Sequence, residues 1–543
     1  MLERRDSYDA LYRAFRWRIP QQFNIGTAVA DGWAKAEPDR VALIDYLGDG
    51  APATLTYGEL AARSNALANA LRALGVARGD RVALLLPQCF ETAIAHVAIY
   101  KLGAIAVPLA LLFGVEALEY RLQTAGVKVV VTNEAGNGKI APIRPRLTML
   151  ETVIAVDGAG GGALGFEALV ADHPAAPVAE ATSPDDPAMM IFTSGTTGPP
   201  KGALHGHRVL LGHLPGVQMP HEFLPQSGDL LWTPADWAWA GGLLNILLPG
   251  LFLGVPVVSA RFERFDPEAA LLLMERMKVR NAFIPPTALR MLKTSGNLAR
   301  RFDLRLRTIG SGGESLGRET YDWAKSALGL TINEFYGQTE CNLVLASCAA
   351  IGVSRGGAIG KPVPGHDVAV IDGDGRRVKT GEPGQIAVRR PDPVMFLEYW
   401  QNPDATAKKF IGEWMTTGDQ GIEDEDGYVH FFGRDDDVIT SAGYRIGPSE
   451  IEDCLTGHPA VALAAVVGKP DPIRTEIVKA YVVLKRGVER REGLAGEISL
   501  WVRERLSAHE YPREVEFVDS MPLTTTGKVI RRIFRDRARA EAE

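Results

Sequence analysis

Short apolar runs alternate with longer amphipathic stretches over much of the chain. Residues 81–87 (RVALLLP) and 127–133 (VKVVVTN) are apolar runs of strand length, and a helical pattern spans Tyr57 to Leu74. Strands that are apolar throughout and separated by helices are typical of parallel sheets covered on both faces. Further runs lie at residues 189–195, 281–285 and 307–313. We therefore predict parallel α/β subdomains, with ligands bound at the carboxyl ends of the strands.

The pattern changes from about Ile359 to Phe432, where short strands alternate with turn signals such as DGDG and DEDGY. This texture predicts a β-rich subdomain. Further strands and a helix are expected at 451–467, 477–484, 498–506 and 515–518, and the acidic GRDDD at 433–437 is the predicted junction. The expected fold class is α/β, with a large N-terminal domain (1–433) of parallel α/β subdomains plus the β-rich subdomain. A small α+β C-terminal domain (434–543) follows it.

Composition narrows the class of protein. Of the 543 residues, 46% are hydrophobic and 23% charged, which is typical of a globular enzyme. The net charge of −7 lacks the excess of positive charge that is typical of nucleic-acid-binding proteins. The four cysteines form no CxxC pair, which disfavours a zinc site or a disulfide framework and favours a reducing, cytoplasmic location.

Three local stretches differ from the rest of the chain in composition. The N-terminus lacks the apolar core of a secretory signal. Residues 243–258 are apolar but interrupted by prolines and glycines, so we expect a buried helix followed by a strand and no transmembrane segment. Basic residues near the C-terminus form either a solvated helix face or an anion-binding surface. They are Lys528, Arg531, Arg532, Arg535, Arg537 and Arg539.

The strongest chemical signal is TSGTTGPPKG at 193–202, directly after an apolar strand. Its glycines let backbone N–H groups approach an anion, its hydroxyls are donors, and Lys201 adds a positive charge. These features predict a phosphate-binding loop, with a flexible surface loop as the alternative. The glycine spacing differs from that of a Walker A loop, and Lys201 is followed by glycine, which disfavours a kinase or P-loop ATPase.

At this loop the chain resembles the adenylate-forming (AMP-binding) superfamily of acyl-CoA synthetases, luciferases and peptide-synthetase adenylation domains. Further motifs of the superfamily occur in the expected order from Thr193 to Lys528. They are SGGES (311–315), EFYGQTE (334–340), TGD (417–419), GRDDDVI (433–439), SAGYRIGPSEIE (441–452) and TTTGK (524–528). Within the superfamily, medium-chain acyl-CoA synthetases are the most similar branch.

The resemblance implies which residues bind ATP or AMP. Tyr336 offers an aromatic face for the base, Thr339 a hydroxyl for the α-phosphate, and Glu340 a carboxylate for Mg²⁺. Asp419 would accept hydrogen bonds from the ribose, although an aspartate after glycine is often only a turn residue. The implied nucleotide set is Thr193, Ser194, Gly195, Thr196, Thr197, Gly198, Lys201, Gly312, Gly313, Glu314, Glu334, Phe335, Tyr336, Gly337, Gln338, Thr339, Asp419, Arg434 and Arg445.

The resemblance also implies a mobile C-terminal domain. Lys528 matches the catalytic lysine, which acts together with Thr339 and Glu340, and Asp436 matches the hinge. Leu523 and Thr524 depart from the proline and lysine that commonly precede the hydroxyl of this motif. The implied coenzyme A contacts are Ala442, Gly443, Tyr444, Arg474 and Arg513.

The acyl pocket is expected at Asp236, Trp237, Trp239 and Gly337, although aromatic residues in such a stretch also serve as core packing. Acetyl-CoA synthetases carry a tryptophan at the position of Gly337, so a glycine there predicts a deep pocket. The expected function is an ATP-dependent acid–CoA ligase that acts on medium-chain, branched or aryl acids. Its expected partners are the acid, ATP, Mg²⁺ and coenzyme A, with a homodimer as a candidate assembly.

Three alternatives stay open at this point. The enzyme could be an acetyl- or propionyl-CoA synthetase, whose substrates are the shortest acids. It could be a stand-alone adenylation enzyme that loads a carrier protein. It could also be a nucleotide-binding sensor without catalysis.

Overall fold

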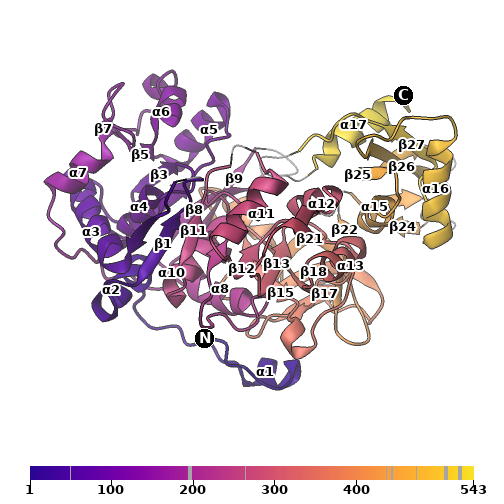
Figure 1. Cartoon of the computed structure of the whole chain (residues 1–543), viewed down its shortest axis with the longest axis horizontal. Coiled ribbons are helices and arrows are strands. Elements are labelled where there is room, and N and C mark those ends of the chain that lie inside the picture. Colours follow the sequence, from indigo (N-terminus) through magenta and orange to yellow (C-terminus); the bar gives the residue numbers. More distant parts are fainter. Residues whose placement is uncertain are drawn as a thin grey trace.

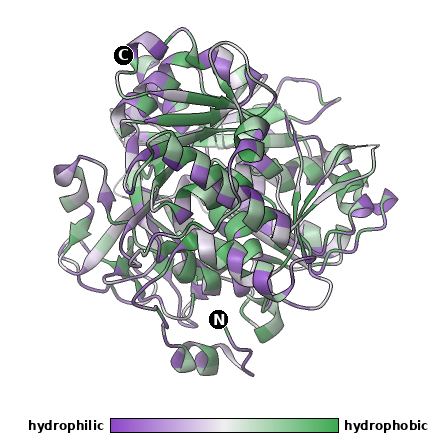
Figure 2. Cartoon of the chain, turned by 90° about the vertical axis from the view of Figure 1, so that its left-hand side faces the viewer, coloured by the Kyte–Doolittle hydropathy of each residue, from purple (hydrophilic) through white to green (hydrophobic). Residues whose placement is uncertain are grey.

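The computed structural model describes residues 1–543 except 49, 194–198, 263, 297, 436, 442–443, 473, 507–510, 524–528 and 543, and the side chains of residues 444 and 445. Three sheets form the larger part of the molecule, here called the N-terminal unit (residues 1–434). A fourth sheet forms the C-terminal unit (residues 439–541), seen in yellow at the right of Figure 1. In Figure 2 the hydrophobic colouring concentrates on the strands, whereas the loops are largely hydrophilic.

The first sheet has eight strands. They are β3 (Arg81–Leu85), β4 (Ile105–Pro108), β5 (Val129–Thr132), β6 (Thr152–Ala155), β7 (Leu164–Gly165), β8 (Pro187–Thr193), β9 (Lys201–Gly206) and β19 (Glu398–Tyr399). Their order is β19-β9-β8-β4-β3-β5-β6-β7, parallel from β8 to β7 and antiparallel at β9 and β19. In β3, Val82 and Leu84 join one buried cluster and Ala83 and Leu85 another. Because alternate side chains point to opposite faces, a strand covered on both sides is apolar throughout.

Helices connect these strands and supply the two covering layers. α3 begins with a capping box, because Thr56 Oγ1 accepts from Glu59 N–H and the Glu59 carboxylate accepts from Thr56 N–H. The predicted helix at 57–74 is therefore confirmed with its local cause. The helices of this region are α1 (Tyr8–Ala14), α2 (Gly32–Ala36), α3 (Tyr57–Ala73), α4 (Phe90–Lys101), α5 (Val115–Ala125), α6 (Glu134–Ile140) and α7 (Phe166–Asp172).

The second sheet has nine strands. They are β1 (Val41–Asp45), β2 (Ala53–Thr56), β10 (Leu231–Trp232), β11 (Val257–Ser259), β12 (Asn281–Phe283), β13 (Thr308–Gly312), β14 (Ile332–Gln338), β15 (Cys341–Ala346) and β16 (Lys361–Pro362). Their order is β16-β15-β14-β13-β12-β10-β11-β1-β2. Strands β13 and β14 are parallel neighbours with Ser311 opposite Glu334 and Gly312 opposite Phe335. The SGGES and EFYGQTE motifs therefore leave the sheet side by side at its carboxyl edge, as parallel strands require.

The helices of this sheet include the stretch that is apolar enough to resemble a membrane span. Residues 240–253 form a continuous buried helical segment, and β11 follows it, which confirms the predicted helix and strand. Among the described residues, none of the helices combines the length and apolarity needed to cross a membrane. The helices are α8 (Val209–Gln218), α9 (Ala240–Gly242), η3 (Leu243–Leu247), α10 (Leu248–Leu253), α11 (Pro267–Arg276), α12 (Pro286–Thr294) and α13 (Arg318–Ala327).

The β-rich subdomain is confirmed as a separate antiparallel sheet. Its elements are β17 (Val368–Ile371), β18 (Pro383–Arg389), α14 (Pro403–Ala407), β20 (Phe410–Ile411), β21 (Trp414–Glu423) and β22 (Val429–Arg434). The strand order is β17-β18-β21-β20, with β22 also paired to β21. In that pairing Asp419 lies opposite Arg434, which brings the TGD and GRDDD motifs together.

The C-terminal unit is the expected small α+β structure. Its elements are β23 (Ile439–Ser441), β24 (Tyr444–Ile446), α15 (Pro448–Thr456), β25 (Val461–Asp471), β26 (Thr475–Leu484), α16 (Leu494–Arg505), β27 (Glu514–Phe517) and α17 (Arg531–Ala540). The arginines of α17 pair with carboxylates: Arg531 with Glu452, Arg535 with Asp437 and Arg537 with Glu516. Arg531 and Arg537 thus attach α17 to its own unit, whereas Arg535 attaches it to Asp437 of the junction.

Candidate nucleotide and acyl site

The predicted phosphate-binding loop joins β8 to β9. Thr193 and Lys201 form the last cross-strand pair of this hairpin, and the Thr193 hydroxyl donates to the Lys201 carbonyl at 3.4 Å. Residues Ser194 to Gly198 lie outside the described residues. The Lys201 Nζ stands 5.1 Å from the ring centroid of Tyr399, which belongs to the neighbouring strand β19. The hairpin thus carries the lysine to the edge where β19 joins the sheet.

Glu340 lies close to the same edge. It follows Thr339 at the tip of the β14–β15 hairpin, and its side chain is buried. The Tyr399 hydroxyl donates to Oε1 of Glu340, and Phe396 N–H donates to the Glu340 carbonyl at 2.8 Å. Tyr399 therefore contacts both Lys201 and Glu340. Tyr399 is not among the residues predicted from the sequence, because it lies 59 residues from Glu340 and belongs to no local motif.

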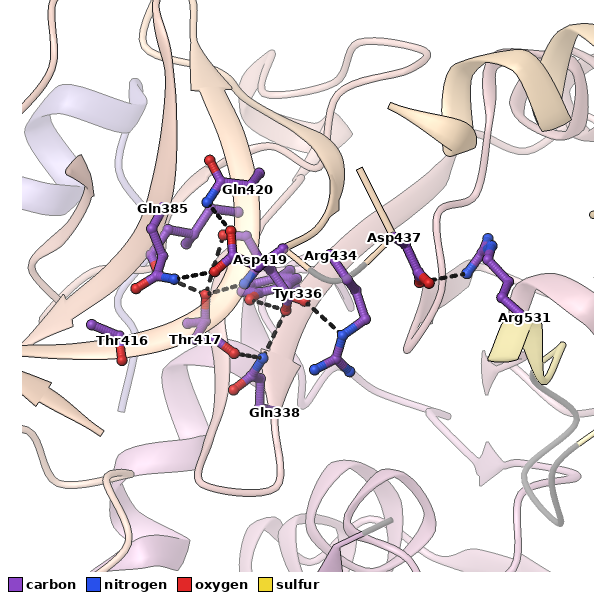
Figure 3. Close-up of polar contacts among 12 residues, drawn as sticks. Tyr336, Gln338, Gln385, Thr416, Thr417, Asp419, Gln420, Arg434, Asp437 and Arg531 are labelled. Carbon is purple, nitrogen blue, oxygen red and sulfur yellow. Dashed lines mark hydrogen bonds and ion pairs between the residues drawn. The ribbon is translucent and has the colours of Figure 1, made fainter. Parts of the chain in front are cut away.

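Asp419 is the centre of a hydrogen-bonded cluster (Figure 3). Its Oδ2 accepts from the Tyr336 hydroxyl at 2.6 Å and from Gln338 Nε2 at 2.7 Å. Arg434 places Nε 3.8 Å from Oδ1. Burial first, and then the Asp419 charge, hold the pKa of Tyr336 well above its ordinary value of 10, so the phenol remains a donor. The structure brings four predicted nucleotide residues together here.

The orientation of Gln338 is set by a second contact. Lys409 Nζ donates to Gln338 Oε1 at 3.3 Å, so the amide nitrogen faces Asp419 and also donates to the Thr417 carbonyl at 2.7 Å. Because lysine is only a donor, this contact identifies which end of the amide is oxygen. Lys409 is a supporting residue that sequence reasoning did not identify.

The junction between the units is anchored on both sides of the predicted hinge. Asp435 accepts from the side chains of Gln385 and Gln420, which belong to the β-rich sheet. Asp437 accepts a hydrogen bond at 2.9 Å from Arg535, which lies on α17. Figure 3 shows the contact of Asp437 with Arg531 of the same helix. Asp436 itself lies outside the described residues. The side chains of its two neighbours therefore contact different units, while Asp437 N–H donates to the Arg434 carbonyl at 3.0 Å.

The segment 312–314 packs closely on β14. A Cβ at Gly312 would lie 2.5 Å from the ring and carbonyl of Phe335, and Gly313 has a φ of +95°. Only glycine allows the close approach at position 312, and only glycine adopts the backbone conformation at position 313 without strain. The Glu314 carboxylate accepts from the Thr287 hydroxyl and from Arg290 at 3.1 Å.

Glu334 and Phe335 point away from solvent. Glu334 is 6% exposed, its Oε1 accepts from Leu316 N–H at 3.1 Å, and burial raises its pKa from 4.5 to about 8. Phe335 is 5% exposed, in a hydrophobic cluster with Phe283. The sequence predicted both as nucleotide contacts. The structure places both side chains in the interior, where they support the backbone of the motif.

The acyl candidates divide between one core position, Trp237, and two partly buried positions, Asp236 and Trp239. Trp237 is 1% exposed within the largest hydrophobic cluster, which matches the core-packing alternative. Trp239 is half-buried and packs edge-on against Phe113 with centroids 5.6 Å apart. Burial raises the pKa of Asp236 to about 6, while Ala238 N–H donates to its Oδ1 at 2.9 Å and acts in the opposite direction.

Gly337 does not match the expectation of an open pocket. A Cβ at this position would lie 2.2 Å from the Leu343 nitrogen and 2.5 Å from the Asn342 Cα. The direction of a side chain therefore leads into the backbone of β15. A side chain at position 337 must first displace the hairpin, so the glycine permits close packing of the two strands and this geometry gives no support to the expected deep pocket.

Of the residues predicted for coenzyme A and catalysis, only part can be placed. Arg474 lies between β25 and β26, where Thr475 pairs with Ser441, and Arg513 precedes β27. Arg513 stacks 5.0 Å from the ring centroid of Tyr511. Ala442, Gly443 and Lys528 lie outside the described residues, as do the side chains of Tyr444 and Arg445.

Two protein-family models match successive parts of the chain. A model of the AMP-binding enzyme family matches residues 30–400, and a model of the AMP-binding enzyme C-terminal domain matches residues 450–528. The mitochondrial acyl-coenzyme A synthetase ACSM4 of Mus musculus is 34% identical, covering 98% of this chain and 93% of that protein. An acetyl-coenzyme A synthetase of Bacillus subtilis (strain 168) is 32% identical, covering 97% and 94%.

Solved structures are similar over nearly the whole chain. The anthranilate CoA ligase AuaEII in complex with anthranoyl-AMP has a TM-score of 0.89 at 29% identity, covering 96% of this chain and 99% of that one. MatB from Rhodopseudomonas palustris has a TM-score of 0.84 with ATP bound, at 28% identity, and of 0.75 in its apo form, at 27%. Both MatB structures cover 96% of this chain and 99% of their own.

Proposed function

The chain belongs to the AMP-binding enzyme family, and we propose that it ligates a medium-chain, branched or aryl carboxylic acid to coenzyme A. The ligation is ATP-dependent and proceeds through an acyl-adenylate. The family match and the full-length similarity to CoA ligases and acyl-CoA synthetases support the acid–CoA ligase activity. The class of acid is the proposed part.

The observation that best supports nucleotide binding, on which the ligation depends, is the cluster around Asp419. The carboxylate is 6% exposed and its Oδ2 already has two donors, Tyr336 and Gln338. Its Oδ1 is 3.8 Å from Arg434 Nε and keeps capacity to accept hydrogen bonds from ribose hydroxyls. A buried, oriented carboxylate beside an aromatic ring and an arginine suits the sugar and base of a nucleotide better than it suits a surface turn.

The reaction needs two steps because a carboxylate is a poor electrophile. Its oxygen attacks the α-phosphate of ATP, and pyrophosphate leaves. The thiol of coenzyme A, on losing its proton, then attacks the carbonyl carbon of the mixed anhydride, and AMP leaves as the thioester forms. We assign charge stabilisation in the first step to Lys201, Lys528 and the 194–198 loop. The domains 1–433 and 434–543 are proposed to reorient about Asp436 between the steps.

The donor set fits a magnesium ion. Glu340 is a buried carboxylate beside the phosphate-loop hairpin, and Mg²⁺ is commonly held by one or two carboxylates together with substrate phosphates. When bound, the ion would neutralise charge on the phosphates. Tyr399 would hold Glu340 in position through its hydrogen bond.

The proposed acid class has two supports. Half-buried Trp239 and the ring of Phe113 offer apolar area next to Asp236, where an acyl or aryl group could pack. Similar proteins include acyl-CoA synthetases and ligases for benzoate and anthranilate. The similarity to an acetyl-coenzyme A synthetase keeps the shortest acids as the competing class.

Hydroxylamine trapping tests the proposal directly. The enzyme is incubated with ATP, Mg²⁺ and acetate, propionate, hexanoate, octanoate, benzoate or an amino acid, and acyl-hydroxamate is measured. Thioester is then measured after addition of coenzyme A. We expect the highest kcat/KM with hexanoate, octanoate or benzoate. A preference for acetate would show that the enzyme acts on the shortest acids instead of the proposed class. Hydroxamate formation without thioester formation would favour an enzyme that loads a carrier protein. Absence of hydroxamate with every acid would contradict the ligase activity.

A further inference from the structure

Helix α13 is capped by a residue of the other unit. Its N-cap position is Gly317, which has no side chain and adopts φ +79° and ψ 151°. The first N–H of the helix, that of Arg318, donates to Oδ2 of Asp453 at 2.9 Å. Asp453 lies on α15 in the C-terminal unit, 135 residues further along the chain. An aspartate normally caps its own helix, so this carboxylate performs the task across the boundary between units.

The two residues fit each other sterically. A Cβ at Gly317 would lie 2.0 Å from Oδ1 of Asp453 and 2.6 Å from its Cγ. The carboxylate therefore occupies the space that a side chain at 317 would need. The positive φ alone favours glycine here, and the close approach adds a reason that depends on where the C-terminal unit lies.

The charges around Asp453 belong to the N-terminal unit. Burial raises the pKa of Asp453, whereas Arg318 N–H and the charges of Arg290 and Lys293 lower it, and Glu319 opposes them. The carboxylate thus loses water when it forms the cap and regains it when the units separate. The net free energy that such a cap contributes shifts the equilibrium between the two domain arrangements by about threefold to tenfold. The capped arrangement is therefore favoured, and the other one stays accessible.

The capped turn is attached to the proposed nucleotide site. Leu316 N–H donates to the buried Glu334 at the start of EFYGQTE, and Arg318 N–H donates to Asp453. The turn that directly follows the SGGES segment is therefore held from one side by each unit. Asp453 does not belong to the proposed nucleotide contacts, so any role in the reaction is one of positioning.

Two observations connect this arrangement with the first half-reaction. Arg531 pairs with Glu452, the residue before Asp453, and its pKa is raised by nearby carboxylates that include Glu314 of the N-terminal unit. The start of α17, just after the 524–528 motif, is therefore paired with α15 directly beside the capping residue. The chain is also more similar to ATP-bound MatB than to its apo form, with TM-scores of 0.84 and 0.75.

We infer that Asp453 is a positioning residue, which caps α13 across the unit boundary and thereby favours the arrangement in which the acyl-adenylate forms. The inference rests on the proposed two-step ligation. Loss of the cap slows adenylation and leaves the thioester step from supplied acyl-adenylate unchanged or faster. Asparagine retains the acceptor oxygen and is as good an N-cap as aspartate, so it preserves the function.

The first experiment measures both half-reactions separately in Asp453→Ala, Asp453→Asn and Asp519→Ala. Asp519 is a matched control, because it is a carboxylate of the same unit whose partner, Arg490, lies in that unit too. We expect Asp453→Ala to lower the rate of hydroxamate formation by about threefold to tenfold and the other two variants to match the parent. The inference would be overturned if Asp453→Ala slowed both half-reactions equally or left both rates unchanged, because in either case the ratio of the two rates stays the same.

A double-variant cycle separates the cross-unit clash from local strain. Gly317→Ala should slow adenylation more than Asp453→Ala does, because its methyl group collides with the carboxylate. In the Gly317→Ala background, Asp453→Ala removes the collision and should restore part of the rate. If the two losses simply multiplied, the effect of Gly317→Ala would be local strain, and the cross-unit fit would be wrong.

Hydrogen exchange provides a readout that does not depend on activity. In the parent and in Asp453→Asn, the amides at the start of α13 should exchange slowly, whereas in Asp453→Ala they should exchange several-fold faster. Unchanged exchange in Asp453→Ala would show that the cap does not form in solution and would overturn the inference. If the parent adenylated none of the acids, the proposed function would fail, and the exchange measurement would still decide whether the cap exists.

Discussion

The hydroxyl of Tyr336 donates to Oδ2 of Asp419 at 2.6 Å, although the two residues are 83 positions apart. Tyr336 belongs to β14 of the second sheet, and Asp419 belongs to β21 of the β-rich sheet. Gln338 donates to the same oxygen at 2.7 Å. The contact therefore joins two sheets at the point where we place the ribose.

Removal of this hydroxyl should weaken nucleotide use without loss of the aromatic face. A hydrogen bond to a charged group contributes about 1.5 to 3 kcal/mol. We expect Tyr336→Phe to lower kcat/KM for ATP by about tenfold to hundredfold in pyrophosphate exchange. Tyr12→Phe is the control. Tyr12 lies on α1, outside the proposed site, and this variant loses the hydrogen bond from the Tyr12 hydroxyl to the His366 carbonyl. Equal effects of the two variants would remove Tyr336 from the nucleotide site.

Glu340 should determine the response to magnesium. Glu340→Gln keeps an acceptor for the Tyr399 hydroxyl but removes the negative charge. Loss of a charged oxygen ligand should raise the Mg²⁺ concentration for half-maximal adenylation by roughly tenfold or more. Glu398→Gln, an exposed carboxylate on the adjacent strand β19, is the control. An unaltered magnesium titration in Glu340→Gln would exclude Glu340 as a ligand.

Gly337 should tolerate no side chain, because the backbone of β15 occupies the position of its Cβ. We expect Gly337→Ala to reduce the free energy of unfolding by about 1 to 3 kcal/mol, as overpacked positions do. Denaturant unfolding measures the change. Gly138→Ala is the control, because a Cβ there meets nothing within 4 Å. A Gly337→Ala variant as stable as this control, with altered acid preference, would restore the pocket interpretation.

Glu334 should make the protein less stable as pH rises. Burial raises its folded-state pKa from 4.5 to about 8, so between these values the folded state holds a proton that the unfolded state has lost. The free energy of unfolding therefore falls with pH across this window. Glu334→Gln cannot ionise and retains an acceptor for Leu316 N–H, so its stability relative to the parent should increase as pH rises from 4.5 to 8.

Thermal unfolding at several pH values in that range measures the difference. Glu497→Gln is the control, because Arg491 lowers the pKa of this exposed carboxyl and its titration falls below the window. Parallel pH profiles for the parent and Glu334→Gln would mean that Glu334 is not held in its neutral form.

Much of the fold follows from local sequence. The apolar run at 81–87 is a strand because its alternate side chains meet two buried clusters, and α3 begins at a capping box. The predicted run at 307–313 is likewise confirmed as β13, whose last residues begin the SGGES motif. These features depend on backbone geometry and on residues close in the chain, which a sequence displays directly.

The orientation of individual side chains was less predictable. Phe335 and Trp237 lie in motifs expected at the site, yet both side chains face the interior. Where both faces of an element are covered, apolar residues appear on each, and periodicity does not distinguish core from pocket. At Gly337, only the position of β15 reveals that the glycine permits close packing of two strands.

The sequence by itself determined the element types, the order of the motifs and the family they indicate. The tertiary structure decided which distant groups meet: Tyr399 with Glu340, Tyr336 with Asp419, and Asp453 with the start of α13. The physical reason is that a hydrogen bond depends on a distance of about 3 Å between two atoms. Separations of 59 to 135 residues leave that distance undefined until sheets and units have packed.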